Sequence, residues 1–337
     1  MKLSASTRPA MLAVSLVAAL LVSGCASTSV SGTKASSGAS GATVKPATIR
    51  IGTLATQDAL PLWVAEDKGY FAKAGVSNVK IIPFQSAVEC QAAFTAGAVD
   101  ALMTDLIVSA NLRGSGTKVV LPMVMLGADT AQGRFAIVGA PGTAFRSMAD
   151  LKGVPVGTSS PTITEYVLDK LMEEAGVAAA DVKTEEVKKM PVRFQLLMAG
   201  QLKAASLPEP FVSLAVQQGA YIVPGGDDTK ARQNLSQTVL CVNEAFAHSP
   251  EGGAALKGVL SAWDSAAADI NASPDSFRTT LVSKANLPAP LAKTYKVSSY
   301  PKATPPSRPD IQRVLDWMKQ KGYLRAAVTP QDLLEGK

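Results

Sequence analysis

The sequence predicts an α/β protein of two similar lobes, each built on a doubly wound and mostly parallel sheet. Two observations lead to this prediction. A β-α-β-α-β order of elements occurs twice, in residues 49–103 and 154–206, and polar loops follow the strands of both copies. Alternating strands and helices are typical of parallel sheets with helices on both faces. The 337 residues suffice for two lobes, each with its own core.

The first half of each copy is a short strand that ends in Gly-Thr. Residues 49–53 read Ile-Arg-Ile-Gly-Thr, and residues 154–158 read Val-Pro-Val-Gly-Thr. In both copies a polar loop and a helical pattern follow. These helices end near Gly75 and Gly176, where glycine favours a C-cap.

The second half of each copy is a strand, a helix ending in Ala-Gly, and an apolar strand that leads to an acid. The predicted ranges are 79–84, 87–96 and 99–103 before Asp105, and 182–187, 192–199 and 202–206 before Glu209.

The other segments complete this arrangement. Strands 119–125 and 134–138 would flank a crossing between lobes, and residues 220–224 would begin the return. A strand at 239–246 and helices at 254–272, 275–285 and 309–321 would return to the first lobe. We therefore expect lobe 1 in residues 47–130 plus 226–337 and lobe 2 in residues 131–225.

The N-terminal segment predicts export. Lys2 and Arg8 precede a short apolar run that ends in Val-Ser-Gly-Cys at Cys25, which resembles a bacterial lipoprotein signal. We expect residues 1–24 to be the signal peptide, Cys25 to be lipidated, and the Ser/Gly/Ala-rich residues 25–46 to be a flexible tether. The alternative is an ordinary secretory leader with a coincidental cysteine.

The composition excludes several classes of function. Apolar residues make up 47% and charged residues 18%, which is typical of a globular protein. The net charge is +6, but the basic residues are scattered along the chain without a dense run, so we expect no nucleic-acid binding. The single histidine, His248, predicts no metal site. Cys90 and Cys241 form either a disulfide or two buried free thiols.

Ligands of such sheets bind beyond the carboxyl ends of the strands, where helix N-termini also supply N–H donors. The candidate ligand-binding residues in these positions are Gln57, Asp58, Ser86, Thr104, Asp105, Arg134, Ser159, Ser160, Thr162 and Glu209.

Several of these candidates have a structural alternative. Ser86 and Thr162 are suited to N-capping, the latter in a capping box with Glu165. Arg134 could grip an acidic ligand group or be a solvated hinge residue. Asp105 could cap the helix that follows it, and Glu209 could face solvent or pair with a lysine.

Four strings resemble the periplasmic substrate-binding proteins of ABC importers, most closely the SsuA/THI5-like branch of sulfonate, taurine, nitrate and thiamine-precursor binders. They read LWVAEDKGYF from Leu62, AGAVDA from Ala96, DLKGVPVG from Asp150 and LPEP from Leu207. The resemblance covers residues 47–245.

The resemblance implies a type II periplasmic-binding-protein fold and a solute-binding role at the cell envelope. A small polar molecule would be trapped between the lobes and delivered to a membrane permease with its ATPase subunit. We expect a monomer without a cofactor.

Two other classes of function remain open. A thiamine-pyrimidine-synthase-like enzyme would share the architecture, but its active-site histidine and Cys-rich motif have no counterpart here, so we expect no enzyme activity. A surface lipoprotein that binds other proteins would not need two sets of strand-end loops.

The charge of the ligand is open as well. The resemblance favours an oxyanion. Asp105 and Glu209, at matching positions of the two copies, would instead favour a ligand with amino groups.

Overall fold

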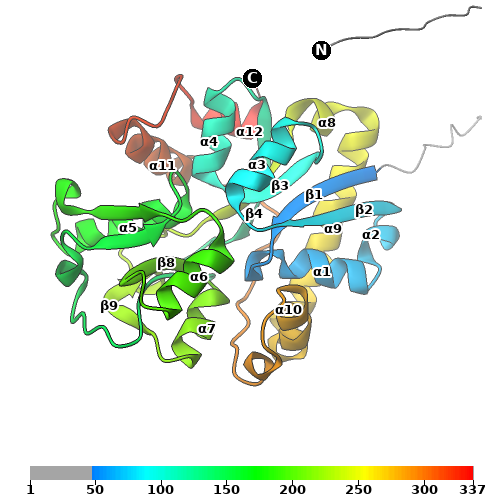
Figure 1. The fold of residues 1–337 in the computed structure, drawn as a ribbon. Helices are drawn as coiled ribbons and strands as arrows, with labels where there is room; N and C mark the ends of the chain where they lie inside the picture. Colours follow the sequence, from blue (N-terminus) through cyan, green and yellow to red (C-terminus); the bar gives the residue numbers. More distant parts are fainter. Residues whose placement is uncertain (1–47, 337) are drawn as a thin grey trace, which may run out of the picture. The chain divides into compact units, whose positions relative to one another are not determined.

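The computed structural model describes residues 48–336. The predicted signal peptide, Cys25 and nearly all of the tether lie outside the described residues. The ten strands of the described part form two five-stranded sheets, and helices cover the faces of both (Figure 1).

The first sheet has the strand order β2-β1-β3-β10-β4. β1 pairs in parallel with β2 and β3, whereas β10 is antiparallel to β3 and β4. The bounds are β1 Thr48–Leu54, β2 Asn78–Phe84, β3 Ala101–Asp105, β4 Val119–Leu126 and β10 Thr238–Asn243.

The second sheet, of order β7-β6-β8-β5-β9, repeats this pattern. β6 pairs in parallel with β7 and β8, and β5 is antiparallel to β8 and β9. The bounds are β5 Phe135–Gly139, β6 Pro155–Thr158, β7 Lys183–Glu186, β8 Ala204–Pro208 and β9 Tyr221–Asp227. The predicted α/β fold of two lobes is confirmed, but both sheets are mixed rather than mostly parallel, because β10 and β5 pair in antiparallel fashion on both of their sides.

The antiparallel strand of each sheet marks where the chain crosses between the lobes. β5 follows β4 of the other sheet directly, and β10 follows β9 after the short 3-10 helix Asp228–Lys230. Two connections therefore join the lobes. Such a pair can act as a hinge because only a few backbone angles must change for the lobes to rotate.

Helices pack on the first sheet from both sides. One group shares a core with β1, β3 and β10, centred on the fully buried Trp263. It comprises α1 Leu60–Asp67, α2 Tyr70–Lys73, α9 Pro250–Ala272 and α10 Arg278–Lys284. The other group comprises α3 Ala87–Thr95, α4 Leu106–Gly114, α11 Arg308–Gln320 and α12 Pro330–Glu335, and α8 Glu244–His248 follows β10.

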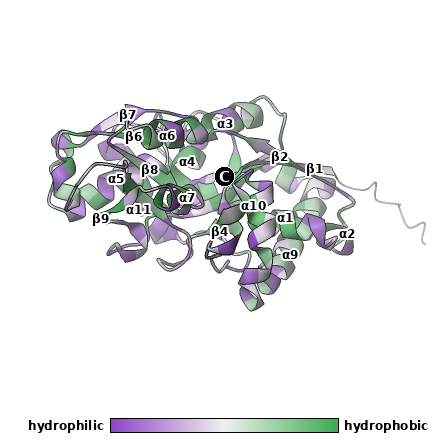
Figure 2. Ribbon diagram, turned by 60° about the horizontal axis from the view of Figure 1, so that its bottom comes forward, coloured by the Kyte–Doolittle hydropathy of each residue, from purple (hydrophilic) through white to green (hydrophobic). Residues whose placement is uncertain are grey.

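The second sheet is covered by α5 Ile163–Glu174 on one face and by α6 Met190–Met198 and α7 Phe211–Gln217 on the other. Figure 2 shows hydrophobic residues concentrated along the strands and the inward parts of the helices, with polar residues outside. Among residues 48–336, no helix has the length and apolarity that crossing a membrane requires.

One hydrophobic cluster is continuous across the lobes. It contains residues of α3 and α4 from the first lobe, α5 from the second, and α11, which lies beside α4 and α5 (Figure 1). Trp317 of α11 meets the ring of Tyr166 edge to face at 5.1 Å between centroids. Its indole N–H donates to Asp169 at 2.9 Å, so α11 attaches α5 to the first lobe.

The repeated Gly-Thr of β1 and β6 has a steric reason. A Cβ on Gly52 would lie 2.6 Å from Sγ of Cys90, and one on Gly157 would lie 2.5 Å from Cδ1 of Leu202. Each glycine therefore lets a neighbouring element pack directly on the strand. Cys90 and Cys241 are both buried free thiols, as the second alternative for them stated.

Some predicted bounds are wrong. β3 and β8 begin two residues later than expected, because the first apolar residues, Val99 and Leu202, are buried in the turns before the strands. The strand expected at 239–246 ends at Asn243, whose side chain accepts a hydrogen bond from Phe246 N at 3.0 Å and begins α8.

Candidate functional site

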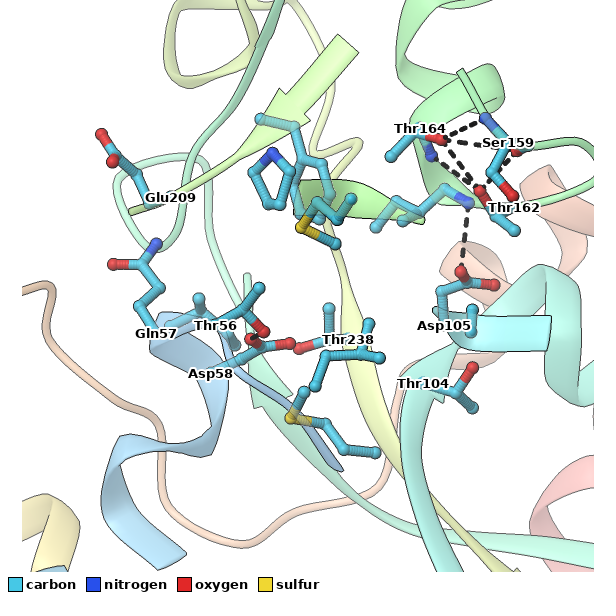
Figure 3. A pocket seen from close by; sticks show the side chains of 18 of the residues that line it. Thr56, Gln57, Asp58, Thr104, Asp105, Ser159, Thr162, Thr164, Glu209 and Thr238 are labelled. Atoms are coloured by element: carbon cyan, nitrogen blue, oxygen red, sulfur yellow. Dashed lines mark hydrogen bonds between the residues drawn. The ribbon is translucent and has the colours of Figure 1, made fainter. Parts of the chain in front are cut away.

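A pocket of about 50 Å³ lies where strand ends of both lobes meet (Figure 3). Eight of the ten predicted residues line it: Gln57, Asp58, Thr104, Asp105, Arg134, Ser159, Thr162 and Glu209. Apolar side chains such as Met103, Leu126 and Phe135 complete its walls. Whether these residues bind a ligand stays a prediction.

Ser86 and Ser160 do not line this pocket. The Ser86 hydroxyl N-caps α3 by accepting from Glu89 N at 3.2 Å. Ser160 donates its backbone N–H to Glu186 at 2.9 Å. Both lie at a strand end as expected, but Ser86 stabilises the start of α3, and Ser160 contacts the end of β7.

Asp105 links the N-termini of two helices. One carboxylate oxygen accepts from Val108 N of α4 at 2.8 Å, and the other accepts from Ile163 N of α5 at 3.1 Å. The helix-capping alternative for Asp105 is therefore correct, and the same side chain also joins the two lobes. Burial raises the pKa of Asp105 to about 6, against the lowering effect of these N–H donors.

The loop before α5 is held by its own hydroxyl groups. Thr162 Oγ1 donates to Ser159 O at 2.6 Å and accepts from Thr164 N at 3.3 Å. The predicted cap is present, but the capping box is wrong. Glu165 points away and accepts from Tyr323 Oη at 2.7 Å, and its carboxylate pairs with Lys321 at 2.9 Å.

Asp58 is a buried carboxylate in the short 3-10 helix Gln57–Ala59, with 8% of its surface exposed. The hydroxyl of Thr56 donates to it, and Thr238 faces it in the pocket (Figure 3). Desolvation raises the pKa of Asp58, and the Thr56 and Thr238 hydroxyls lower it. No cation among residues 48–336 contributes to this balance.

Gln57 is fixed by the C-terminal part of the first lobe. Its side-chain oxygen accepts from Tyr295 Oη at 2.6 Å, and its backbone oxygen accepts from Tyr300 Oη at 2.6 Å. The segment between α10 and α11 therefore positions the loop that follows β1.

Glu209 lies beside Gln57, on the side of the pocket away from Asp105 (Figure 3), and Arg134 is its cationic partner. The Glu209 carboxylate accepts from the backbone N and the hydroxyl of Ser213, at 3.1 and 2.9 Å. Nη1 of Arg134 lies 3.6 Å from Oε1 of Glu209, and Nε of Arg134 lies 3.5 Å from Oδ1 of Asp227. The two alternatives for Glu209, solvent or a lysine partner, are wrong because this buried carboxylate pairs with an arginine.

Five polar residues of the pocket were not among the predicted ones: Thr56, Thr164, Lys188, Arg193 and Thr238. Arg193 of α6 is buried and donates to the backbone oxygens of Val187 and Ser206, which fixes the ends of β7 and β8. Thr238 is the first residue of β10, and Thr164 lies in the first turn of α5. Lys188 also lines the pocket, but its side chain is exposed. A polar residue just before or after a strand was the available signal, and it applies to Thr238.

The pocket offers hydrogen-bonding groups without a reactive centre. The hydroxyls of Thr104 and Ser159, one from each lobe, are buried and have no hydrogen-bond partner in the described structure. Residues 48–336 hold no group of His, Cys, Asp and Glu arranged to bind a metal ion. A bound solute could supply the missing partners for these hydroxyls.

Residues 42–275, which include both copies of the repeat, match the model of the NMT1-like family. The chain belongs to the NMT1-like family. The sequence has no significant match among curated proteins.

Several solved structures share the fold of this chain. For the aliphatic sulphonate binding protein SsuA from Escherichia coli the identity is 19%, over 86% of this NMT1-like chain and 99% of that one, with a TM-score of 0.68. The alkanesulfonate-binding protein SsuA from Xanthomonas axonopodis pv. citri, bound to MOPS, is 17% identical over 83% of this chain and 95% of that one, with a TM-score of 0.68.

The nitrate-binding NrtA from Synechocystis PCC 6803 gives 15% identity over 84% of this chain and 83% of that chain, with a TM-score of 0.65. At these identities the likeness shows the shared fold. The expected periplasmic-binding-protein fold of this NMT1-like protein is thus confirmed.

Proposed function

We propose that this protein is the extracytoplasmic solute-binding component of an ABC importer, anchored through a lipid on Cys25. The observation that carries the proposal is a small pocket lined by strand ends of both lobes, with an unpartnered hydroxyl on each side. The periplasmic sulfonate- and nitrate-binding proteins of the same fold support it. The solute would pass from this pocket to a permease in the membrane.

Two crossing connections and a shared pocket favour a closing motion. A solute that contacts Thr104 in one lobe and Ser159 in the other makes its full set of hydrogen bonds when the lobes are together. Its binding therefore shifts the balance toward the closed form. Closure excludes water and retains the solute until the permease reopens the lobes.

Catalysis has little support in the described residues. Burial raises the pKa of both Cys90 and Cys241 to about 12, so neither thiol is an available nucleophile. His248 lies at the end of α8 and does not line the pocket. We therefore prefer a binding function to an enzymatic one.

A solute screen tests this function. The protein, unfolded and refolded to remove bound solute, is screened by thermal shift against sulfonates, nitrate, amines, nitrogen heterocycles and amino acids. We expect at least one class to raise Tm and to reduce the radius of gyration in small-angle scattering.

Thr104→Val should weaken the binding of that solute, because it removes a pocket hydroxyl and keeps the side-chain shape. Thr184→Val, at an exposed position of β7, is the matched control and should not. A tight solute that leaves the radius of gyration unchanged would contradict lobe closure, and the absence of any solute would contradict the binding function.

A further inference from the structure

The chemical class of the solute can be inferred from how the charged groups of the pocket are partnered. We propose that the solute is a small organic molecule with a protonated nitrogen, such as a primary ammonium or an amidinium group, which binds Asp58. This proposal rests on the solute-binding function proposed above.

Asp58 is a carboxylate for which the described chain supplies no cation. It is buried at the pocket wall, and Thr56 and Thr238 flank it (Figure 3). A buried carboxylate carries a large desolvation cost unless it is paired with a cation or takes up a proton. A protonated nitrogen in the pocket would supply this missing pair.

The positions that would suit an oxyanion are already occupied. The carboxylate of Asp105 accepts from Val108 N of α4 and from Ile163 N of α5, so it occupies the N-termini of both helices. An anion bound there would displace this carboxylate or lie against it. Because like charges repel strongly in a buried site, an anionic group is disfavoured at these helix ends.

The cations near the pocket are committed to other partners or are exposed. Arg134 lies close to Glu209 and Asp227, and Arg193 donates to two backbone oxygens. Lys188 is exposed near the rim, where an ion pair contributes little. These three side chains therefore provide little for an oxyanion inside the pocket.

The remaining surface describes the rest of the solute. The unpartnered hydroxyls of Thr104 and Ser159 can accept hydrogen bonds from further N–H or O–H groups. Met103, Leu126 and Phe135 line the same space and would contact a carbon skeleton. An organic cation satisfies both features better than an inorganic ion does.

Probe pairs of similar shape and opposite charge test the inference by titration calorimetry. The pairs are propylammonium with propanesulfonate and acetamidinium with acetate. We expect the cation of at least one pair to bind the wild-type protein and its anion not to bind.

Asp58→Asn should weaken that cation about tenfold to a hundredfold, the loss of one charge-assisted hydrogen bond. Asp316→Asn removes the same charge from an exposed position of α11 and should leave the affinity unchanged. If Asp58→Asn does not fold, Thr104→Val should still weaken the same cation severalfold.

The outcomes separate this inference from the proposed function. Failure of both cations to bind, or an unchanged affinity in folded Asp58→Asn, overturns the inference. If an anion binds instead and Thr104→Val weakens it, the solute-binding function stands and the ligand class is wrong. If no probe binds and the broad solute screen also finds nothing, the proposed function itself is contradicted.

Discussion

Asp228 is a buried carboxyl group next to the return crossing between the lobes. One of its oxygens accepts from Phe135 N at 3.0 Å, and the other has no hydrogen-bond partner in the described structure. Burial raises the pKa of Asp228 to about 7, against the lowering effect of Ser236 and of the Phe135 N–H. The folded state therefore holds the Asp228 proton more tightly than the unfolded chain does.

This imbalance predicts how stability depends on pH. Because folded Asp228 binds its proton more tightly, this proton stabilises the folded state. The contribution is fully present below the ordinary carboxyl pKa and is lost as the pH rises to about 7. Within that window the loss is at most about 1.4 kcal/mol per pH unit. In Asp228→Asn, which cannot titrate, the free energy of unfolding should fall less steeply. Urea unfolding of both proteins at several pH values measures the difference, and equal slopes would contradict it.

Single residues were predictable from sequence where a strand end fixes the direction of the side chain. Asp58, Thr104 and Glu209 follow parallel strands or complete them, and all three line the pocket. Ser86 and Ser160 also lie at strand ends, but Ser86 caps α3 and Ser160 is hydrogen-bonded to Glu186 of β7. Such competition depends on backbone geometry that residue type does not reveal.

Helix α11 illustrates what single elements contribute. It packs on α4, and Trp317 and Lys321 bind α5 through Tyr166, Asp169 and Glu165. Trp317→Ala should reduce the free energy of unfolding by about 3–5 kcal/mol, because it opens a cavity in the cluster common to both lobes.

Trp317→Phe is the matched variant. It keeps the ring contact with Tyr166 and loses the hydrogen bond to Asp169. Its free energy of unfolding should therefore fall by only about 1 kcal/mol, the net contribution of one hydrogen bond. Urea unfolding measures both variants. A loss in Trp317→Ala no larger than that of the phenylalanine variant would show that α11 does not stabilise the junction.

The elements that sequence analysis found were those with clear periodicity. The helix at 309–321 was expected within one residue of α11 at each end. The short helices α4, α7 and α12 were not predicted. The apolar start of α4 follows directly on β3, and the two together resemble one apolar run, although Asp105 at their junction is a usual N-cap residue.

At the scale of the whole molecule, the internal repeat carried most of the information. It indicated two sheets of the same kind, and the structure shows the same strand order in both. Sequence analysis assigned β5 to lobe 2 and β10 to lobe 1 but did not specify that each would pair in antiparallel fashion inside its sheet. β5 and β10 pair with partners far away in sequence, and local patterns do not contain such pairings.

Anchoring by Cys25 is the last prediction. A lipid on this residue would hold residues 48–336 near a membrane through a tether of about 20 residues, which spans on the order of 25 Å as a random coil. Metabolic labelling with an alkyne fatty acid should mark the wild-type protein. Cys25→Ala should lose the label and leave the membrane fraction.

Cys90→Ala is the matched control, because Cys90 is a buried thiol beneath β1 and should take no lipid. Its labelling and fractionation should equal those of the wild type. Solute binding by Cys25→Ala should also be unchanged, since the described residues that line the pocket all fall between 54 and 238. A Cys25→Ala protein that still carries the label would place the lipid elsewhere, and one that loses the label but stays membrane-bound would indicate a second means of attachment.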